Sequence, residues 1–360
     1  MLSQDRPLLA ITMGDPAGVG PEVIIRAWTS PEIHAATRPV VLGHPEIMRR
    51  AAKLLKSPVR IIGLSSASSL KSVTASPTVL SCVNVCSDDV LDVATGQYSA
   101  QAGEAAFQAV TAAANWALKK RVDGIVTAPL SKAALHSAGH KYPGHTELLA
   151  EMCGVPEFAM MLYLPPGKEV RSPNGLGVAH VTLHQSMRSI FDDLTTPAIL
   201  SKCRLAHSVM VRLGVERPRI AVCALNPHAG EDGLFGNEEQ TIIAPAVAAA
   251  REAGINAAGP FPTDTLMMRA QGGEFDAVVA MYHDQGHIAL KLLGMHAAVN
   301  ITLGLPIVRT SVAHGTAFDR AWQGTARSEG MVAAILTAAK LARNSAVPPG
   351  VQTANQPQAP

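Results

Sequence analysis

Short apolar runs alternate with helical stretches along this sequence, and that alternation constrains the fold more than any other feature. The strand-like runs are residues 8–13, 40–43, 124–130, 177–183, 220–225 and 277–281. The main helical stretches are residues 45–55, 103–120, 197–213 and 241–253. Such alternation is typical of a parallel sheet with helices on both faces. The sequence therefore predicts an α/β protein of three layers, α/β/α, with a mainly parallel sheet.

Size and charge narrow the class of protein. The chain has 360 residues, enough for one large α/β unit or two sub-domains with sizeable cores. Thirty Lys and Arg balance twenty-eight Asp and Glu, so the basic excess of a nucleic-acid-binding or membrane-surface protein is missing. Neither a membrane-spanning apolar run nor a signal-peptide pattern is present, and five scattered cysteines favour reduced thiols. We expect a cytoplasmic protein with a small-molecule partner, no nucleic acid and no membrane.

Three of the strand-like runs are followed within a few residues by a histidine: His184, His228 and His283. In open α/β sheets, ligands bind at the carboxyl ends of the strands. A single histidine there is usually only a hydrogen-bonding residue. Three at equivalent places, with Lys291 soon after the last, favour a binding site.

Two further features come after strand-like runs. Residues 14–22, Gly-Asp-Pro-Ala-Gly-Val-Gly-Pro-Glu, form a glycine-rich turn that lacks the third glycine of the dinucleotide fingerprint. Taken alone, these residues indicate either an ordinary tight turn or, more weakly, a phosphate-binding loop. Lys132 is either a functional group or an ordinary lysine at the start of a helix.

Several longer motifs occur in order along the chain: residues 14–22, 144–147 (Gly-His-Thr-Glu), 225–231 (Leu-Asn-Pro-His-Ala-Gly-Glu), 281–286 (Met-Tyr-His-Asp-Gln-Gly) and 299–306 (Val-Asn-Ile-Thr-Leu-Gly-Leu-Pro). Together they resemble the PdxA family, the 4-hydroxythreonine-4-phosphate dehydrogenases, over about residues 7–343. The resemblance implies an isocitrate/isopropylmalate dehydrogenase-like fold, in which residues 1–343 form one unit of two interleaved α/β sub-domains around a cleft. It also implies a homodimer with a shared active site. The proline-rich residues 344–360 have little to bury and are predicted to be a disordered tail.

The resemblance assigns roles to individual residues. His184, His228 and His283 match the family's divalent-metal ligands, with His283 expected from the partner subunit. Imidazoles suit zinc, cobalt or nickel, and magnesium is a further candidate. The substrate-contacting positions are His145, Thr146, Lys291, Asn300 and Arg309. The last three offer an ammonium, an amide and a guanidinium fork, which suit a phosphate.

A cofactor loop is implied near the end of the unit. Residues 314–319, His-Gly-Thr-Ala-Phe-Asp, resemble the adenine-side loop of the isopropylmalate dehydrogenases. NAD, with NADP as the alternative, is therefore assigned to His314, Gly315, Thr316 and Ala317. Trp322 stands where a glycine is common.

The implied reaction is NAD-dependent oxidation of a secondary alcohol at C3 of a 4-phosphorylated four-carbon acid. The resulting β-keto acid would then lose carbon dioxide, and a divalent ion acting as a Lewis acid suits both steps. Asp264 and Lys132 are the candidates for proton transfer. The first candidate substrate is 4-phosphohydroxy-L-threonine, a role in pyridoxal phosphate biosynthesis.

Two departures keep other substrates open. Gln185-Ser186 follows His184 where an apolar-Pro pair is usual, and His287 stands where the biosynthetic members are usually apolar. Both resemble catabolic relatives that act on 4-phospho-D-threonate, on 4-phospho-D-erythronate or on an unphosphorylated dihydrodiol dicarboxylate. Lys291, Asn300 and Arg309, which suit a phosphate, argue against the unphosphorylated dicarboxylate. A metal-dependent hydrolase and a catalytically inactive sugar-phosphate binding protein are the alternatives from other classes.

Overall fold

The structure, a computed structural model, describes residues 6–65, 70 and 73–344. The tail predicted over residues 344–360 therefore lies outside the described residues, except for Asn344.

One twelve-stranded sheet runs through the described residues in the order β3-β4-β2-β1-β5-β12-β11-β6-β7-β10-β8-β9. The strands are β1 (Leu8–Thr12), β2 (Arg38–Gly43), β3 (Arg60–Leu64), β4 (Val79–Asn84), β5 (Gly124–Thr127), β6 (Ala159–Leu164), β7 (Leu176–His180), β8 (Ile220–Cys223), β9 (Ala257–Phe261), β10 (Ala277–Ala280), β11 (Val299–Leu303) and β12 (Arg309–Val312). Neighbouring strands are parallel except in the central run β12-β11-β6-β7, which is antiparallel. The prediction of a mainly parallel α/β sheet is confirmed, and the antiparallel centre is an addition to it.

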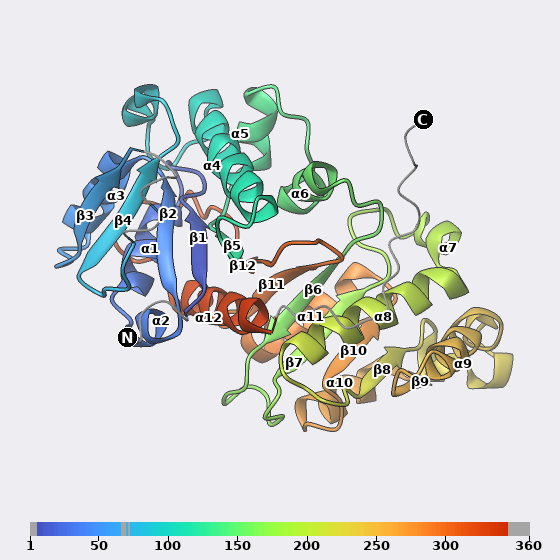
Figure 1. Ribbon diagram of the computed structural model, residues 1–360. Coiled ribbons are helices and arrows are strands. Elements are labelled where there is room, and N and C mark those ends of the chain that lie inside the picture. The colour runs from blue at the N-terminus through green and yellow to red at the C-terminus, as the bar shows by residue number, and fades with distance from the viewer. Residues whose placement is uncertain (1–5, 66–69, 71–72, 345–360) are drawn as a thin grey trace, which may run out of the picture.

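Helices cover both faces of the sheet (Figure 1). The α-helices are α1 (Gly20–Trp28), α2 (Pro31–Ala36), α3 (Pro45–Leu54), α4 (Ala100–Leu118), α5 (Lys132–Ser137), α6 (His145–Cys153), α7 (Ile190–Asp193), α8 (Thr196–Arg212), α9 (Ala244–Glu252), α10 (Thr263–Gln271), α11 (His283–Gly294) and α12 (Glu329–Arg343). Shorter helical segments are η2 (Asp88–Asp92), η3 (Pro227–Gly233) and η4 (Glu239–Ile243). Helix α4 begins three residues before the predicted stretch because the Ser99 side chain caps it, accepting a hydrogen bond from the Ala102 amide.

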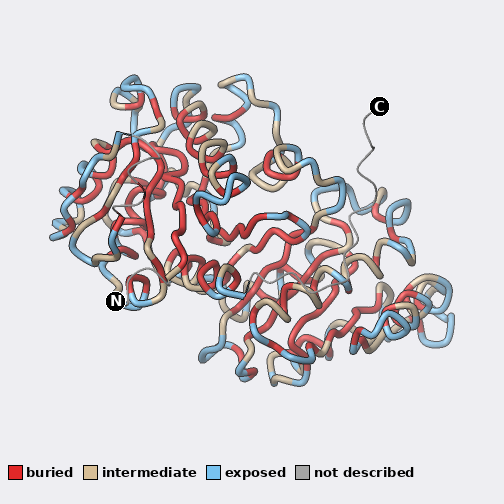
Figure 2. The backbone as a smooth tube through the Cα atoms, in the orientation of Figure 1, coloured by how far each residue is buried: buried red, intermediate tan, exposed pale blue. Residues whose placement is uncertain are grey.

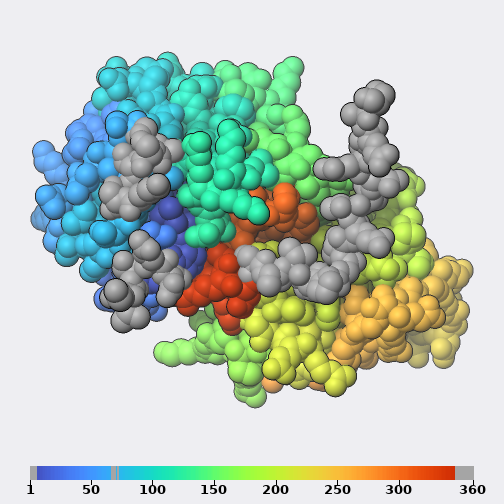
Figure 3. All heavy atoms as spheres, viewed as in Figure 1, coloured from blue at the N-terminus to red at the C-terminus, as the bar shows by residue number. Residues whose placement is uncertain are grey.

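The core follows the strands. Every residue of β1, β5, β6, β7, β8, β10 and β12 is buried, whereas exposed residues lie mainly on helices and turns (Figure 2). Strands β11 and β12 come late in the chain but lie in the middle of the sheet, between a half built by residues 8–127 and a half built by residues 159–280. Figure 3 shows the C-terminal part of the chain, in red, reaching the surface between these halves. The division into two sub-domains stays a prediction.

The register of β7 and β10 determines where the histidines lie. These strands are parallel, and His180 at the end of β7 is paired with Ala280 at the end of β10. The residues that follow the two strands therefore emerge at the same edge of the sheet.

Candidate functional site

A histidine cluster lies at the carboxyl edge shared by β7 and β10. His184 follows β7, and His283 is the first residue of α11. Their ring centroids are 5.8 Å apart. Two imidazoles bound to one tetrahedral ion have centroids roughly 5 Å apart, so this pair fits two ligands of a single metal ion.

Two further histidines lie behind this pair. The ring of His287 stacks on that of His283, with centroids 3.8 Å apart and planes 13° from parallel. Its Nδ1 lies 3.0 Å from Nε2 of buried His180, within hydrogen-bonding distance. Burial lowers the pKa of His180 to about 4 and that of His287 to about 2. Both rings are therefore neutral at pH 7.

Glu147, on α6, faces His184 from the other side. Its Oε1 lies 3.9 Å from Nδ1 of His184, an ion-pair distance rather than a hydrogen bond. His184 lowers the pKa of Glu147 despite its partial burial, and the charge of Lys132 adds to this lowering. A carboxylate beside one ring nitrogen of a histidine leaves the other nitrogen for a metal ion. Lys132 and Glu147 thus belong to the same cluster.

Arg309 is a buried cation at the start of β12. Its Nη1 donates to the Thr302 hydroxyl at 2.9 Å and its Nη2 to the Thr127 hydroxyl at 2.8 Å. The Nε–H is buried and has no partner among the described residues. Burial lowers the pKa of Arg309 to about 10, and the charge of Glu147 partly opposes this. Neither hydrogen-bond acceptor carries a charge, so the guanidinium lacks a bonded anion.

Two other predicted substrate residues also carry buried polar atoms that have no hydrogen-bond partner in the described part of the chain: Nε2 of His145 and Oδ1 of Asn300. Burial, together with the charge of Arg309, lowers the pKa of His145 well below its ordinary value. Lys291 lies close enough to His287 for its charge to lower that histidine's pKa. Thr146 is partly buried at the start of α6. Unpartnered buried polar atoms are rare, and a polar ligand would satisfy them.

His228 lies apart from the other two predicted metal ligands. It is exposed, in a turn whose residues 228–232 all have left-handed backbone angles. The carboxylate of buried Glu239 holds this turn by accepting hydrogen bonds from the amides of Leu225, at 2.8 Å, and Asn226, at 2.7 Å. A backbone strained in this way persists only where its surroundings fix it, and such strain clusters at functional sites.

No group of three or more His, Cys, Asp or Glu side chains within residues 6–65, 70 and 73–344 is arranged to hold a metal ion. One chain thus supplies an adjacent pair, His184 and His283. His283, which the resemblance assigns to the partner subunit, lies beside His184 in the same chain, and its assignment to the partner stays a prediction. Among the described residues, His228 is the predicted ligand that lies apart from this pair.

The predicted cofactor loop, 314–317, packs against the glycine-rich turn. The Val19 amide donates to the Thr316 carbonyl at 3.0 Å. Gly18 permits this approach, since a Cβ there would lie 3.0 Å from that oxygen. A Cβ on Gly315 would meet nothing within 4 Å, so the loop is open on one side. The turn therefore supports the loop, and the open side leaves room for a cofactor.

Asp264 makes no hydrogen bond or ion pair with the histidine cluster among the described residues. It is exposed at the start of α10, where its side chain accepts a hydrogen bond from the Thr265 amide at 2.9 Å. The neighbouring Thr263 accepts a hydrogen bond from Nε2 of Gln285 at 3.0 Å. Of the two proton-transfer candidates, Lys132 is the one whose charge acts on Glu147 of the cluster.

Sequence reasoning missed His180 and gave no role to Glu147, Thr127 or Thr302. A polar residue inside an otherwise apolar strand is the signal for His180, because buried polar side chains need partners. The threonines carry no such signal, since threonine is common in strands.

The chain matches the family described as "Pyridoxal phosphate biosynthetic protein PdxA" over residues 35–338. It is 44% identical to a D-threonate 4-phosphate dehydrogenase of Pectobacterium atrosepticum, over 93% of this chain and 99% of that one. It is also 44% identical to a 4-hydroxythreonine-4-phosphate dehydrogenase of Trichlorobacter lovleyi, over 95% and 99%. A crystal structure of the Klebsiella pneumoniae 4-hydroxythreonine-4-phosphate dehydrogenase is similar, with a TM-score of 0.81, 44% identity and coverage of 93% and 99%.

Proposed function

The chain belongs to the PdxA family of dehydrogenases, and from this premise we propose that it oxidises and decarboxylates a 4-phosphorylated four-carbon hydroxy acid with NAD and a divalent metal ion. NADP is the alternative cofactor. All five cysteines are free, which supports a reducing, cytoplasmic location.

The buried Arg309 is the observation that carries this proposal. A buried charge without an opposite charge is costly, so proteins pair such groups or use them to bind ions. The two threonine hydroxyls hold the guanidinium in place but do not neutralise it. A substrate phosphate supplies the missing anion, and the planar guanidinium suits its oxygens. Lys291 would add an ammonium to this phosphate site, and Asn300 an amide whose Nδ2 donates to Met160 Sδ in the free protein.

The metal ion would be held by His184 and His283 of one chain and by His228 of the partner subunit. When bound, a divalent ion acts as a Lewis acid towards the negative charge that develops on the substrate's C3 oxygen. The carboxylate of Glu147 faces Nδ1 of His184 at 3.9 Å, and the ring of His287 stacks on that of His283. Lys132, near Glu147, is the candidate to move the proton of the C3 hydroxyl.

The dinucleotide would be held at His314, Gly315, Thr316 and Ala317, and when bound it would supply the acceptor for the hydride that leaves C3. The open side of Gly315 is the feature of this loop that fits it.

A homodimer is supported by exposed apolar side chains near the histidines. Ile288, Leu292 and Met295 are 57%, 82% and 49% exposed and share one face of α11, because they are four and three residues apart. Beside the His228 turn, Leu234 and Phe235 are 72% and 47% exposed. Apolar groups gathered in this way mark an interface. We propose that a second copy covers them and supplies its His228 to the His184–His283 pair.

The group at C2 of the substrate separates two candidates. 4-Phosphohydroxy-L-threonine bears an amine, whereas 4-phospho-D-threonate bears a hydroxyl. His287 supports the second, because it is buried in the cluster at a position where the biosynthetic members are usually apolar. We therefore place 4-phospho-D-threonate first, ahead of the biosynthetic substrate that the resemblance favours. 4-Phospho-D-erythronate is the third candidate.

The test is the initial rate of NADH formation with these three acids at equal concentration, each with and without its phosphate, and with an unphosphorylated dihydrodiol dicarboxylate. We expect the highest kcat/KM with 4-phospho-D-threonate and a loss of rate without the phosphate. A higher kcat/KM for 4-phosphohydroxy-L-threonine would restore the biosynthetic assignment. Equal use of an unphosphorylated dihydrodiol dicarboxylate would overturn the phosphate assignment.

A further inference from the structure

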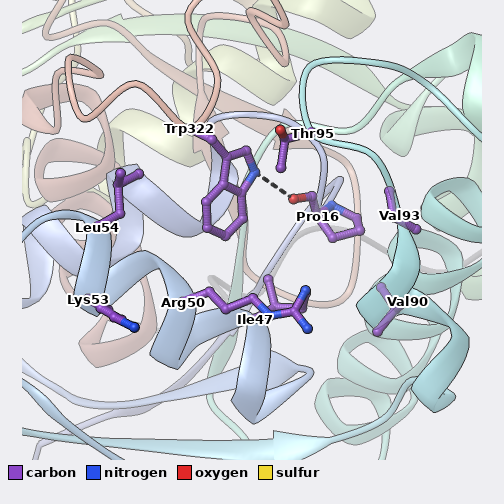
Figure 4. A pocket seen from close by; sticks show the side chains of 9 residues that line it. All are labelled: Pro16, Ile47, Arg50, Lys53, Leu54, Val90, Val93, Thr95 and Trp322. Atoms are coloured by element: carbon purple, nitrogen blue, oxygen red, sulfur yellow. Dashed lines mark hydrogen bonds between the residues drawn. The ribbon is translucent and has the colours of Figure 1, made fainter.

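A cavity of about 460 Å³ lies away from the histidine cluster, at the carboxyl ends of β1, β2 and β4 (Figure 4). These strands are parallel neighbours. Pro16 follows β1, α3 follows β2, and η2 with the loop to Thr95 follows β4. The cavity therefore lies where parallel sheets bind ligands. Its lining is Pro16, Ile47, Arg50, Lys53, Leu54, Val90, Val93, Thr95 and Trp322.

One wall of this cavity is the indole of Trp322, which is fixed at both ends. Its Nε1 donates to the Pro16 carbonyl at 2.9 Å. Its backbone amide and that of Gly324 both donate to the carboxylate of buried Glu22. These bonds hold Trp322 with a left-handed φ of 60°. The ring is thus a flat apolar platform that exists before any ligand binds.

The rim of the cavity is cationic. Arg50 and Lys53 project from the same side of α3, and both are exposed. Nη1 of Arg50 donates to the Leu91 carbonyl at 2.6 Å, which anchors the guanidinium and leaves its other N–H groups free to bind. Within the described residues, no carboxylate pairs with either cation, and no acidic side chain lines the cavity. Its complementary ligand has a flat apolar part and an anionic part.

The cavity and the cofactor loop both contact the glycine-rich turn. The glycine-rich turn joins them, because Val19 bonds the Thr316 carbonyl while Pro16 bonds Trp322. On the other side, the Gly96 amide donates to the Ala17 carbonyl at 2.9 Å, which places Thr95 against the same turn. A dinucleotide at the loop therefore has a built pocket beside it.

We propose that this cavity binds the adenosine end of the dinucleotide, with the adenine against the indole of Trp322 and the phosphates towards Arg50 and Lys53. This inference rests on the proposed NAD dependence. It gives a binding role to Trp322, which stands where a glycine is common. Stacking on an aromatic ring and charge-assisted contacts are the interactions that this chemistry provides.

The test uses ADP-ribose, which lacks nicotinamide and cannot be reduced, with the whole protein. Binding is measured by calorimetry and by tryptophan fluorescence. We expect Trp322→Ala to weaken binding at least about tenfold, the change that about 1.4 kcal/mol of lost stacking produces. Trp322→Phe keeps a ring, so it should keep most of the affinity while removing the fluorescence change. Trp116→Phe, on α4, is the matched fluorescence control and should change neither.

Variants of α3 test the contribution of the cationic rim to ADP-ribose binding. Arg50→Gln and Lys53→Gln should each weaken ADP-ribose binding roughly threefold to tenfold, since each removes a charged contact. Arg49→Gln is the matched control, because Arg49 pairs with Glu46 at 3.0 Å instead of lining the cavity. Lack of ADP-ribose binding by the wild-type protein, or equal binding by the cavity variants, would overturn the proposal.

The outcomes separate this proposal from the proposed function. If NADH forms but Trp322→Ala and Lys53→Gln leave both the KM for NAD and ADP-ribose binding unchanged, the cavity assignment fails and the dehydrogenase stands. If those variants weaken ADP-ribose binding but no phosphorylated hydroxy acid yields NADH, the cavity assignment stands and the proposed reaction fails.

Discussion

Nε2 of His180 and Nδ1 of His287 lie 3.0 Å apart, and the ring of His287 stacks on His283. One of the two nitrogens must donate and the other must accept, so each ring is held in one tautomer. Because burial keeps both rings neutral, the pair fixes His283 without adding charge to the site. The orientation of His283 therefore depends on two buried histidines that are not among the predicted metal ligands.

The variant His287→Leu tests this dependence. It removes both the hydrogen bond to His180 and the aromatic stack on His283. Leucine has a similar size, so the space occupied by the side chain stays filled. We expect zinc affinity, measured by calorimetric titration, to fall at least about tenfold, as is typical when a residue that orients a metal ligand is lost. His296→Leu, at an exposed histidine, is the control. Unchanged zinc affinity in His287→Leu would mean that the pair has only a structural role.

The buried charge of Arg309 should lower the stability of the ligand-free protein, and a bound phosphate should offset this cost. Arg309→Met replaces a buried charge with an apolar side chain, so we expect a melting temperature equal to or above that of the wild type. Adding inorganic phosphate should raise the melting temperature of the wild type but not of the variant. Equal stabilisation of both proteins by phosphate would contradict the assignment.

The same residue should determine activity. Breaking a charge-assisted contact of this kind costs about 2–5 kcal/mol, so Arg309→Ala should lose roughly 30-fold or more in kcat/KM on the phosphorylated substrate. Arg309→Lys should restore little, because lysine lacks the planar fork. On the unphosphorylated analogue, Arg309→Ala should change kcat/KM little. Equal losses on both substrates would contradict phosphate binding.

Subunit mixing tests which chain supplies each metal ligand. His184 and His283 lie together in one chain, so hybrids of His184→Ala and His283→Ala should have no complete site. Hybrids of His184→Ala and His228→Ala should contain one complete site and regain part of the activity. Recovery in the first mixture and not in the second, with subunit exchange shown by mass spectrometry, would reverse the assignment.

Asp15 should make the protein less stable as pH rises. Burial raises the pKa of this carboxyl from 3.8 to about 6, while its Oδ1 accepts a hydrogen bond from Ala17. The folded state then holds a proton that the unfolded state loses, so stability falls between about pH 4 and pH 6, by up to about 3 kcal/mol. Asp15→Asn should match the wild type at pH 4 and exceed it at pH 8 in urea unfolding. If the two proteins differed in free energy of unfolding by the same amount at pH 4 and pH 8, the raised pKa of Asp15 would be contradicted.

The alternating pattern of the sequence predicted six strands, β1, β2, β5, β7, β8 and β10, and the helices α3, α4, α8 and α9, because apolar periodicity is local information. It did not predict that β11 and β12 enter the middle of the sheet, with β11 antiparallel to both β12 and β6, because strand pairing depends on contacts between residues far apart in the chain.

In the candidate site, too, some residues could be predicted from local sequence and others depended on contacts between distant segments. His184 and His283 were identifiable at strand ends, and the parallel register of β7 and β10 brought them together. The isolation of His228 was not visible, because it depends on a left-handed turn fixed by Glu239 from a later segment. Asp264 was chosen by motif alone, and its exposure could be seen only in three dimensions.

The most direct test of the proposed reaction measures NADH formation and carbon dioxide release together, with 4-phospho-D-threonate and protein that has been depleted of metal and then resupplied. We predict equal amounts of NADH and carbon dioxide, loss of both after depletion, and recovery of both with zinc, cobalt, nickel or magnesium. Release of inorganic phosphate without NADH would contradict the account and indicate a metal-dependent hydrolase instead.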